Sequence, residues 1–389
     1  MNGFRPTGLR LLVCSSVVLI ALSLSTLPAG AAPGSRAVPW SPNPGSFNSL
    51  IAVSADSASD AWAVGYYETG GGVDKTLIVH WNGSSWSKLP SPNPNPNYNV
   101  LGGVTAVSPT DAWAVGQTKT GTIPETLIMH WNGTKWTRVP SPSPGIDGIL
   151  LGVAASPASG KNAWAVGSYL SSTGAESLHT LILHWNGTAW SRVKSPNPTT
   201  QGNALSGVSM TSAKSAWAVG SISSGDQTLI LHWNGTKWSQ VKSFSVSGDL
   251  TSVSSASPST GWAVGSDDDS PTHTIIAARS GSTWSTEASP NPSAAGNYLY
   301  GVSADSATSA WAVGYETQSS DQYILIARWS GTIWQQVPGV NPSSTSNKLY
   351  GISAVSTTSA WAVGSYVDDN TSDTDTLILH WNGTSWTQQ

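Results

Sequence analysis

The chain has 389 residues, of which 17 are Lys or Arg and 21 are Asp or Glu, giving a formal net charge of −4. Only 10% of the residues are charged, so the chain lacks the dense basic surface that nucleic acid requires, and we expect no nucleic-acid partner. The single cysteine, Cys14, excludes an internal disulfide and any cysteine-ligated metal cluster.

The first 31 residues have the order of a secretory signal peptide. Arg5 and Arg10 precede an apolar run over 11–24, and the small residues Ala29-Gly30-Ala31 follow it. The run is short for a membrane span, and Cys14 has no small residue before it, so neither a membrane anchor nor a lipid anchor is expected. We therefore expect a secreted, extracellular protein that is cleaved near Ala31 and is a monomer.

A unit of roughly fifty residues then occurs seven times, and we number these repeats one to seven in chain order. Repeats of this length, made only of short strand-like runs, are typical of sheets arranged radially in a closed ring. The sequence predicts an all-β fold, a seven-bladed β-propeller of four-stranded antiparallel blades. The first tryptophan of each repeat is Trp62, Trp113, Trp164, Trp217, Trp262, Trp311 or Trp361. The repeats lie near 45–94, 95–144, 145–198, 199–244, 245–292, 293–342 and 343–389.

The second repeat illustrates the four expected strands. They cover 101–107, 112–116, 126–131 and 136–139, and the second of them alternates small and large residues with the period of a strand. Asn132-Gly133 joins the third and fourth strands, where we expect a two-residue hairpin with positive φ at both central positions. Proline residues end the fourth strand.

Alternation also predicts how neighbouring repeats pack. In the second strand Trp113 and Val115 point to one side, and Ala112, Ala114 and Gly116 point to the other, so a bulky face can nest against a flat one. We therefore interpret the tryptophans as packing residues. A histidine precedes the third-strand tryptophan in five repeats, and we expect each to bond within its own repeat rather than to share a metal. These are His80, His130, His184, His232 and His380.

The pattern L-x-G-V-S-A-x-S-x-x-x-A-W-A-V-G resembles the repeats of secreted bacterial seven-bladed propellers. The segment W-N-G-T-x-W is similar to the Asp-box hairpin, S-x-D-x-G-x-x-W, of sialidases and photosystem assembly factors, and kelch-type propellers are a more distant likeness. The resemblance implies an architecture and no activity. Asn132 stands where an Asp-box has its aspartate, and repeat five, which reads Ala278-Arg279-Ser280-Gly281, lacks both the histidine and the third-strand tryptophan.

The phase of the repeats predicts where the ring closes. The chain stops just after Trp386, and residues 32–44 begin at the matching point with Trp40-Ser41-Pro42-Asn43-Pro44. We expect all four strands of the last blade to come from the C-terminus, and residues 32–44, Trp40 among them, to seal the seam.

Two sets of polar residues are candidates for ligand binding. An asparagine enters the first strand in five repeats, with tyrosines nearby, and amide and phenol groups around the mouth of a central channel could hold a carbohydrate. The alternative is that each asparagine caps the turn before its strand. The asparagines are Asn48, Asn99, Asn203, Asn297 and Asn347, and the tyrosines are Tyr98, Tyr298, Tyr300 and Tyr350.

Acidic residues gather in the loops between the second and third strands, which hold 14 of the 21 Asp and Glu residues. Two runs supply oxygen ligands of the kind that calcium accepts, although neither matches an established calcium loop. They are therefore either a calcium site or solvated loops, and no cofactor is required. The residues are Asp267, Asp268, Asp269, Asp368, Asp369, Asp373 and Asp375.

The sequence carries no catalytic signature, since no nucleophile elbow or zinc motif occurs and the few arginines are scattered. We expect a secreted, non-enzymatic binding or scaffold propeller that recognises a glycan, a cell-wall polymer or a protein through its variable loops. A hydrolase or lyase that uses loop carboxylates near the axis is an alternative, and a purely structural surface protein is a second one.

Overall fold

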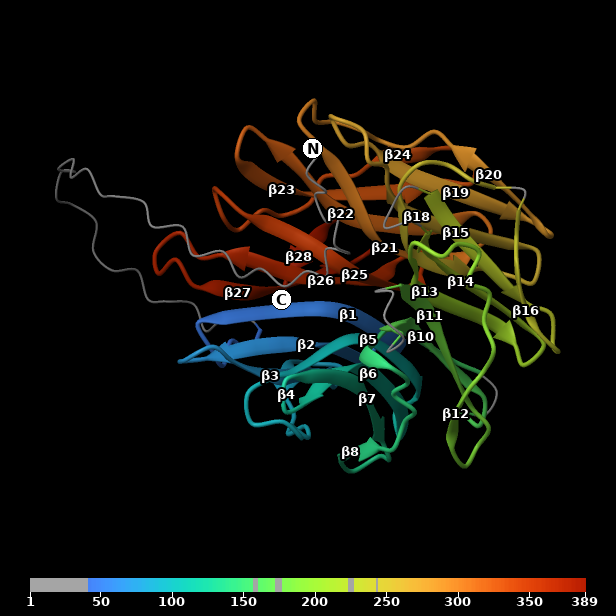
Figure 1. The fold of residues 1–389 in the computed structure, drawn as a ribbon. Coiled ribbons are helices and arrows are strands. Elements are labelled where there is room, and N and C mark those ends of the chain that lie inside the picture. The colour runs from blue at the N-terminus through green and yellow to red at the C-terminus, as the bar shows by residue number, and fades with distance from the viewer. Residues whose placement is uncertain (1–40, 157–159, 172–176, 223–226, 243) are drawn as a thin grey trace, which may run out of the picture.

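The computed structural model describes residues 41–156, 160–171, 177–222, 227–242 and 244–389. These residues form strands and connecting loops, with no helix among them, so none of the described segments is a helix that could cross a membrane. The expected signal peptide at 1–31, residues 32–40 and Trp40 lie outside the described residues. Figure 1 shows the sheets arranged around a common centre, with the last strands beside the first.

Each repeat folds into four consecutive strands paired antiparallel. The first strands are β1 (Phe47–Ser57), β5 (Asn99–Ser108), β9 (Ile146–Ala155), β13 (Asn203–Ser212), β17 (Asp249–Ser255), β21 (Asn297–Ser306) and β25 (Asn347–Ser356). The second strands are β2 (Asp60–Thr69), β6 (Asp111–Thr120), β10 (Ala163–Leu170), β14 (Ser215–Ile222), β18 (Thr260–Ser266), β22 (Ser309–Gln318) and β26 (Ser359–Val367).

The outer two strands of each repeat shorten toward the rim. The third strands are β3 (Val73–Trp81), β7 (Ile123–Trp131), β11 (Leu178–Trp185), β15 (Gln227–Trp233), β19 (Thr274–Ser280), β23 (Asp321–Trp329) and β27 (Thr374–Trp381). The fourth strands are β4 (Trp86–Lys88), β8 (Trp136–Val139), β12 (Trp190–Arg192), β16 (Trp238–Gln240), β20 (Thr283–Glu287), β24 (Trp334–Gln336) and β28 (Trp386–Gln388).

Repeats two to six form separate four-stranded sheets, whereas repeats one and seven share an eight-stranded sheet. A single parallel pair, Phe47 with Thr374, joins β1 to β27. The first strands pack against one another in succession, and β25 packs against β1. The prediction of an all-β fold of repeated four-stranded antiparallel sheets is therefore confirmed.

Serines of the first strands link neighbouring repeats near the centre. The Ser54 hydroxyl accepts a hydrogen bond from the Ala106 amide of the next repeat, over 3.0 Å. Ser353 accepts one from Ala55 over the same distance, so the pattern also joins repeat seven to repeat one. This explains the serine of the repeated G-V-S-A segment, for which sequence periodicity alone gave no reason. Equivalent bonds involve Ser209, Ser254 and Ser303.

Tryptophans fill the interfaces between repeats. The ring of Trp62 in repeat one lies 4.9 Å from Trp131 and meets Trp136 edge to face at 5.1 Å, both in repeat two. Trp361 of repeat seven meets Trp81 and Trp86 of repeat one in the same way. All seven second-strand tryptophans are buried, and each core cluster combines residues of two adjacent repeats. The packing interpretation of these residues is confirmed.

A bulge recurs in every first strand, directly after its buried leucine. In repeat one, Leu50 pairs with Gly65 and Ala52 pairs with Val64, so Ile51 is left unpaired. The bulge brings the two strands so close that a Cβ on Gly65 would lie 1.9 Å from the Ser49 carbonyl oxygen. The glycine of A-W-A-V-G is required for this close approach.

The hairpin prediction was wrong in most repeats. Trp131 pairs directly with Trp136, which leaves a loop of four residues rather than two, and only Gly133 has a positive φ, of 89°. The Asn132 side-chain oxygen accepts hydrogen bonds from the Thr134 amide, the Thr134 hydroxyl and the Lys135 amide, at 2.8–3.1 Å. Asparagine is therefore needed here as a side-chain cap, not for a left-handed backbone. The two-residue loop occurs in repeat five, where Ser280 pairs with Thr283.

The histidines bond within their own repeats, as expected. His80 Nε2 lies 2.5 Å from an Asp60 carboxylate oxygen, and its ring stacks on Trp62 at 4.1 Å. His130, His184, His232 and His380 contact Asp111, Asn162, Ser215 and Ser359 in the same manner.

The S-P-N-P linkers fasten the third strands. After repeat one, the Asn93 side-chain oxygen accepts a hydrogen bond from the Thr76 amide over 2.8 Å. In repeat seven the residue that performs this role comes from the start of the chain: Asn43 accepts a bond from the Thr376 amide over 2.7 Å. The Ser41 hydroxyl lies 2.6 Å from that of Thr376. Ser41 and Asn43 thus contact repeat seven as the S-P-N-P linker contacts repeat one.

Candidate functional site

The five candidate asparagines are buried and bonded. Asn99 accepts a hydrogen bond from the Asn95 amide and donates to the carbonyls of Asn95 and Asp74, so one side chain joins its own linker to the preceding repeat. Each of the five is at most 1% exposed, and the other four make the same set of contacts. These contacts leave no polar atom for a ligand and favour the turn-capping interpretation over carbohydrate binding.

Tyr98 is separate from the other candidate tyrosines. Its hydroxyl accepts a hydrogen bond from Gln117 over 2.6 Å, and the Lys119 ammonium lies 4.0 Å from its ring centre. Burial, followed by the nearby Asp74 carboxylate, raises the pKa of Tyr98 to about 12. Both its face and its hydroxyl are therefore occupied by neighbouring side chains.

Tyr298, Tyr300 and Tyr350 are brought together, with Tyr315 as a fourth member, and we call these four residues the tyrosine cluster. The Tyr315 ring lies 4.9 Å from Tyr298 and stacks on Tyr300 at 5.7 Å with an interplanar angle of 17°. Tyr350 of repeat seven meets Tyr300 edge to face at 5.6 Å. Tyr298, Tyr300 and Tyr315 remain partly exposed, and Tyr350 is 9% exposed.

The bulge explains why these rings meet. Tyr300 and Tyr350 are the unpaired bulge residues of β21 and β25, while Tyr298 and Tyr315 are cross-strand partners. A bulge redirects a side chain, and the first strands pack against each other, so bulge residues of adjacent repeats come into contact. The other repeats carry Ile51, Gly102, Leu151, Ser206 and Thr251 at this position. The cluster is therefore confined to one sector.

The surroundings of the cluster are polar as well as aromatic. Burial, together with the neighbouring tyrosines, holds the pKa of Tyr300 well above its ordinary value, so its phenol is neutral at physiological pH. The Lys348 ammonium lies 5.2 Å from the centre of the Tyr315 ring. Tyr315 and Lys348 were not among the sequence candidates. Tyr315 could have been found, because the strand register that the repeat pattern implies places it opposite Tyr298.

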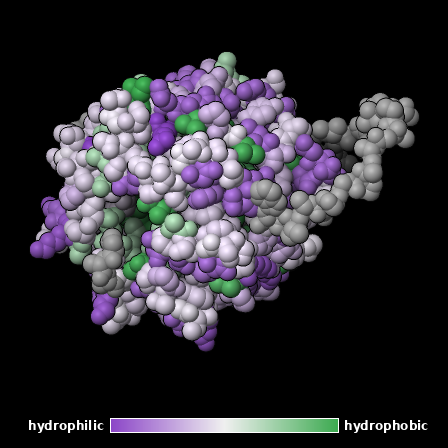
Figure 2. All heavy atoms as spheres, turned by 180° about the vertical axis from the view of Figure 1, so that it is seen from behind, coloured by the Kyte–Doolittle hydropathy of each residue, from purple (hydrophilic) through white to green (hydrophobic). Residues whose placement is uncertain are grey.

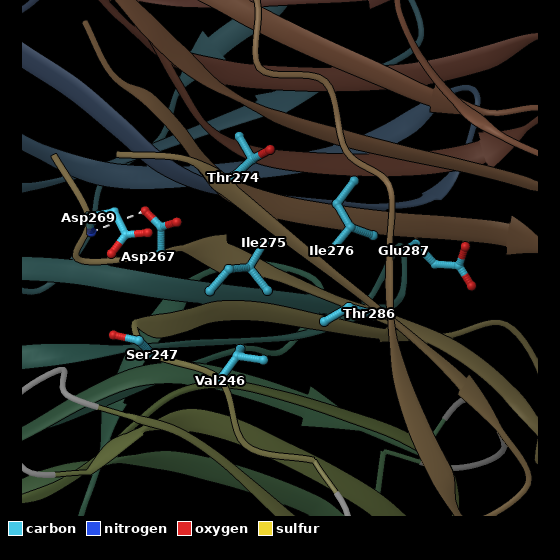
Figure 3. Close-up of a pocket in the computed structure, with 9 residues that line it drawn as sticks. All are labelled: Val246, Ser247, Asp267, Asp269, Thr274, Ile275, Ile276, Thr286 and Glu287. Carbon is cyan, nitrogen blue, oxygen red and sulfur yellow. Dashed lines mark hydrogen bonds between the residues drawn. The ribbon is translucent and has the colours of Figure 1, made fainter. Parts of the chain in front are cut away.

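A second candidate site is a cavity of about 300 Å³ that is lined by residues of repeat five. Figure 3 shows Asp267 and Asp269 at one end and Glu287 at the other, with Ile275 and Ile276 between them. Val246 and Ser247 from the linker, together with Thr274 and Thr286, complete the lining.

Asp267 and Asp269 approach His273, which sequence reasoning missed because it lies four residues beyond the acidic run. Their ligand atoms all lie within 4.8 Å of one another, and this is the only such group of three among the described residues. Both Asp267 oxygens already serve His273: one accepts its amide over 2.7 Å, and the other lies 3.1 Å from Nδ1. Asp268 is exposed and is not a member of the group.

The acidic run of repeat seven uses its carboxylates within the loop. Asp368 accepts hydrogen bonds from the Asn370 and Thr371 amides. Asp369 accepts them from Ser343 and Ser344, and these bonds lower the pKa of Asp369. Asp375 is 9% exposed, with the Tyr366 hydroxyl 3.5 Å away, and Asp373 does not gather with the others into a ligand group among the described residues.

The outer surface offers no broad apolar patch on the face seen in Figure 2, where hydrophobic residues are scattered singly among polar ones. The large hydrophobic residues that are exposed among the described segments are Ile123, Ile146 and Ile333. Isolated residues of this kind are ordinary on protein surfaces.

No protein-family profile and no curated protein matches the chain. Solved structures do. A GH74 xyloglucanase from Xanthomonas campestris aligns with a TM-score of 0.59 and 11% identity over 88% of this chain, which spans 54% of that enzyme. An ulvan lyase of polysaccharide lyase family PL25 aligns with a TM-score of 0.52 and 9% identity over 86% of this chain and 92% of its own.

A fungal lectin from Aleuria aurantia, described as a six-bladed β-propeller, aligns with a TM-score of 0.45 and 12% identity over 89% of this chain and 96% of its own. At these identities the likenesses concern the fold alone. The repeated four-stranded antiparallel sheets, whose first strands contact one another in a closed succession, define the chain as an all-β protein of the β-propeller class.

Proposed function

We propose that this protein is a secreted, monomeric, non-enzymatic β-propeller of seven blades that binds a glycan or cell-wall polymer through the tyrosine cluster. The observation that carries the proposal is the convergence of Tyr298, Tyr300, Tyr315 and Tyr350 in one sector of an otherwise repetitive ring. The residues that recur in every repeat are explained by packing between repeats. The tyrosine cluster occurs in one sector only, and the other repeats pack without such a cluster, so packing does not explain it.

The blade count rests on three supports. Each of seven repeats supplies four consecutive strands, the first strands contact one another in a closed succession, and the seven core clusters each span two adjacent repeats. We treat the eight-stranded sheet as two blades joined by one parallel pair. The W-N-G-T-x-W hairpins are proposed as relatives of the Asp-box.

The chemistry of the cluster suits a sugar ring. Tyrosine presents an apolar face for the C–H side of a pyranose and a hydroxyl that can exchange hydrogen bonds with its hydroxyl groups. Neutral phenols act as both donors and acceptors, and the raised pKa of Tyr300 keeps this property across physiological pH. The rings sit on paired strands rather than on long loops, so little side-chain order has to be created on binding.

A glycan array tests the proposal, run with and without calcium on protein purified from a secreting host. We expect retention on at least one polymer, with loss of roughly tenfold or more in affinity for Tyr298→Ala and Tyr315→Ala, because two rings of the cluster are removed. Tyr323→Ala, in the same repeat but outside the cluster, is the matched control. Retention that is equal in all variants, or no retention on any polymer, contradicts the proposal and favours a structural protein.

Secretion is tested on the same material. We propose that the mature chain begins near residue 32, and N-terminal sequencing of the protein from the culture medium checks it. A chain that keeps Cys14 contradicts the proposal.

An alternative, a secreted glycan-active hydrolase or lyase, is favoured by one observation. Glu68 and Asp74 are directly opposed on β2 and β3, and burial together with Glu68 raises the pKa of Asp74 to about 6. Two neighbouring carboxyls, one of them with a raised pKa, are the kind of pair that glycoside hydrolysis uses. Turnover of a polysaccharide panel that is abolished by Asp74→Asn and Glu68→Gln supports it, and the same turnover in both variants excludes it.

A further inference from the structure

Repeat five places a carboxylate opposite an imidazole at a position where the other repeats do not. Asp267 follows Ser266, the last paired residue of β18, and the Asp267 amide donates to the His273 carbonyl over 2.9 Å. The two side chains therefore meet where β18 ends and β19 begins. The corresponding pairs of the other repeats are Tyr67 with Lys75, Thr118 with Glu125, Tyr169 with His179, Ile222 with Gln227, Glu316 with Tyr323 and Tyr366 with Asp375.

The Asp267 carboxylate is held in one orientation by the main chain. Its Oδ1 atom accepts hydrogen bonds from the amides of Asp269 and His273, over 3.3 and 2.7 Å. Its Oδ2 atom faces His273 Nδ1, which is 3.1 Å away. The Asp267 side chain is 18% exposed and that of His273 is 45% exposed, so the carboxylate is set into the surface while the imidazole remains accessible. Hydrogen bonds to the second oxygen orient ligating carboxylates in metal sites in the same way.

The separations of these groups fit the ligands of one zinc ion. Zinc binds histidine nitrogen and carboxylate oxygen at about 2.0–2.2 Å, so two ligands of a tetrahedral zinc lie about 3.4 Å apart. The 3.1 Å between Asp267 Oδ2 and His273 Nδ1 is close to that value. Asp269 completes a group of three whose ligand atoms all lie within 4.8 Å of one another. Because Asp269 is exposed, a rotation of its side chain can shorten the longer separations.

We propose that Asp267, Asp269 and His273 bind a zinc ion. Carboxylate oxygens alone suit calcium, whereas the imidazole nitrogen favours zinc. On binding, the proton on His273 Nδ1 leaves to solvent, and the Nδ1 to Oδ2 hydrogen bond is replaced by one bond from each atom to the metal. Asp269 supplies the third bond, and a water molecule takes the fourth position.

The surroundings of the three residues suit a divalent cation. Two carboxylates and a neutral imidazole balance the two charges of the ion, and no Lys or Arg lines the adjoining cavity. Figure 3 shows the Asp267 and Asp269 side chains at the same end of that cavity, which leaves space for the water ligand. The ion joins the end of β18 to the start of β19 and closes the loop between them, so its binding should stabilise repeat five.

Isothermal titration calorimetry with zinc chloride, on the chelator-treated full chain, tests the proposal. We expect one zinc per chain, with affinity lower by about tenfold or more in His273→Ala and in Asp269→Asn. Asp269→Asn changes an exposed side chain and keeps the contact between Asp267 and His273, so it remains informative if His273→Ala folds poorly. Circular dichroism melting without metal checks that each variant folds.

His179→Ala is the matched control. His179 occupies the position of His273 in repeat three, but the residue opposite it is Tyr169, whose ring it stacks on at 5.4 Å. This variant should bind zinc as the parent protein does. Tyr298→Ala should also bind zinc normally, which separates the metal site from the proposed glycan site.

The remaining outcomes decide against the proposal. No heat at millimolar zinc means that the loop is only solvated. Equal affinity in the parent protein, His273→Ala and Asp269→Asn, or an equal loss in His179→Ala, means that zinc binds elsewhere. Zinc should raise the melting temperature of the parent protein and calcium should not, and a calcium affinity equal to that for zinc contradicts the role given to the imidazole.

Discussion

The guanidinium of Arg279 lies 4.9 Å from the ring centre of Trp217, in the place where the other repeats put a third-strand tryptophan. Arg279 is 2% exposed, and its terminal nitrogens donate hydrogen bonds at 2.8–3.0 Å to the carbonyls of Ser257, Pro258, Thr260 and Gly281. Burial lowers its pKa. Repeat five thus retains the interface by stacking a cation, whose charge is satisfied by the main chain, on an indole.

Replacing Arg279 by alanine should destabilise the protein by about 2–4 kcal/mol, because four buried carbonyls lose their donors. Urea unfolding followed by circular dichroism measures the change. Arg328→Ala is the control, since Arg328 also stacks on a tryptophan, Trp311 at 4.9 Å, but makes one weak hydrogen bond of 3.4 Å. A loss of about 1 kcal/mol or less is expected there. Equal losses in the two variants would contradict the role given to the main-chain bonds.

Asn99→Ala should cost about 2–4 kcal/mol of unfolding free energy, because it leaves buried main-chain groups of the linker and of the preceding repeat unpaired. The hairpin asparagine Asn132, which is exposed, should cost only about 1 kcal/mol when changed to alanine. Thermal melting compares the two. If Asn99→Ala has the same melting temperature as the parent protein, the asparagine does not stabilise the contact between repeats.

The raised pKa of Asp74 predicts that the free energy of unfolding depends on pH. Burial raises its folded-state pKa to about 6 from an unfolded value of 3.8, so folding favours the protonated form. Its contribution is fully present below pH 3.8 and is lost as the pH rises through about 6. Because the side chain is half exposed, the loss is about 1 kcal/mol rather than the full amount that the shift implies. Asp74→Asn should remove this dependence and raise stability at pH 7, as measured by urea unfolding across the pH range. An unchanged pH profile would count against the raised pKa.

Calcium should leave the melting temperature unchanged. Asp267 is already bonded to His273, whose nitrogen is a poor calcium ligand, and the loop of repeat seven uses Asp368 and Asp369 for its own amides. Differential scanning calorimetry of chelator-treated protein, before and after calcium is added, checks this. A rise in melting temperature that disappears in Asp267→Asn or Asp369→Asn would establish a calcium site.

Ser41 and Asn43 bond to Thr376, and we call these contacts the clasp. The clasp should stabilise the contact between repeats one and seven. Asn43→Ala removes two hydrogen bonds to Thr376, of 2.7 and 2.9 Å, and should lower the unfolding free energy by about 1–2 kcal/mol. Hydrogen exchange should show faster exchange in β27 and β28 than in the parent protein. Asn93→Ala, the equivalent change within the chain, is the control, because covalent continuity still holds that linker in place. Unaltered exchange in β27 would show that the seam does not depend on the clasp.

The order of strands and the tryptophan packing could be predicted from sequence because both follow from short-range alternation repeated many times. The hairpin could not, since Asn-Gly is compatible with more than one turn, and the choice is made by the pairing of Trp131 with Trp136. The asparagines of the first strands allowed two interpretations, ligand binding and turn capping, which differ in whether the side chain is exposed or buried. That burial depends on how closely the neighbouring repeat packs. His273 and Tyr315 were missed because each joins its site through cross-strand or loop geometry and not through sequence spacing.

The clasp between Ser41 and Thr376 joins atoms 335 positions apart in the chain. A chain made from its N-terminus therefore exposes the segment around Ser41, and the edge of repeat one that faces repeat seven, until the last repeat has emerged. Each repeat in between can add to the one before it, but the final interface forms only when the oldest and youngest segments meet. Completion of the ring is thus a single late event, and any species that stops short of it carries two matching surfaces able to engage another chain.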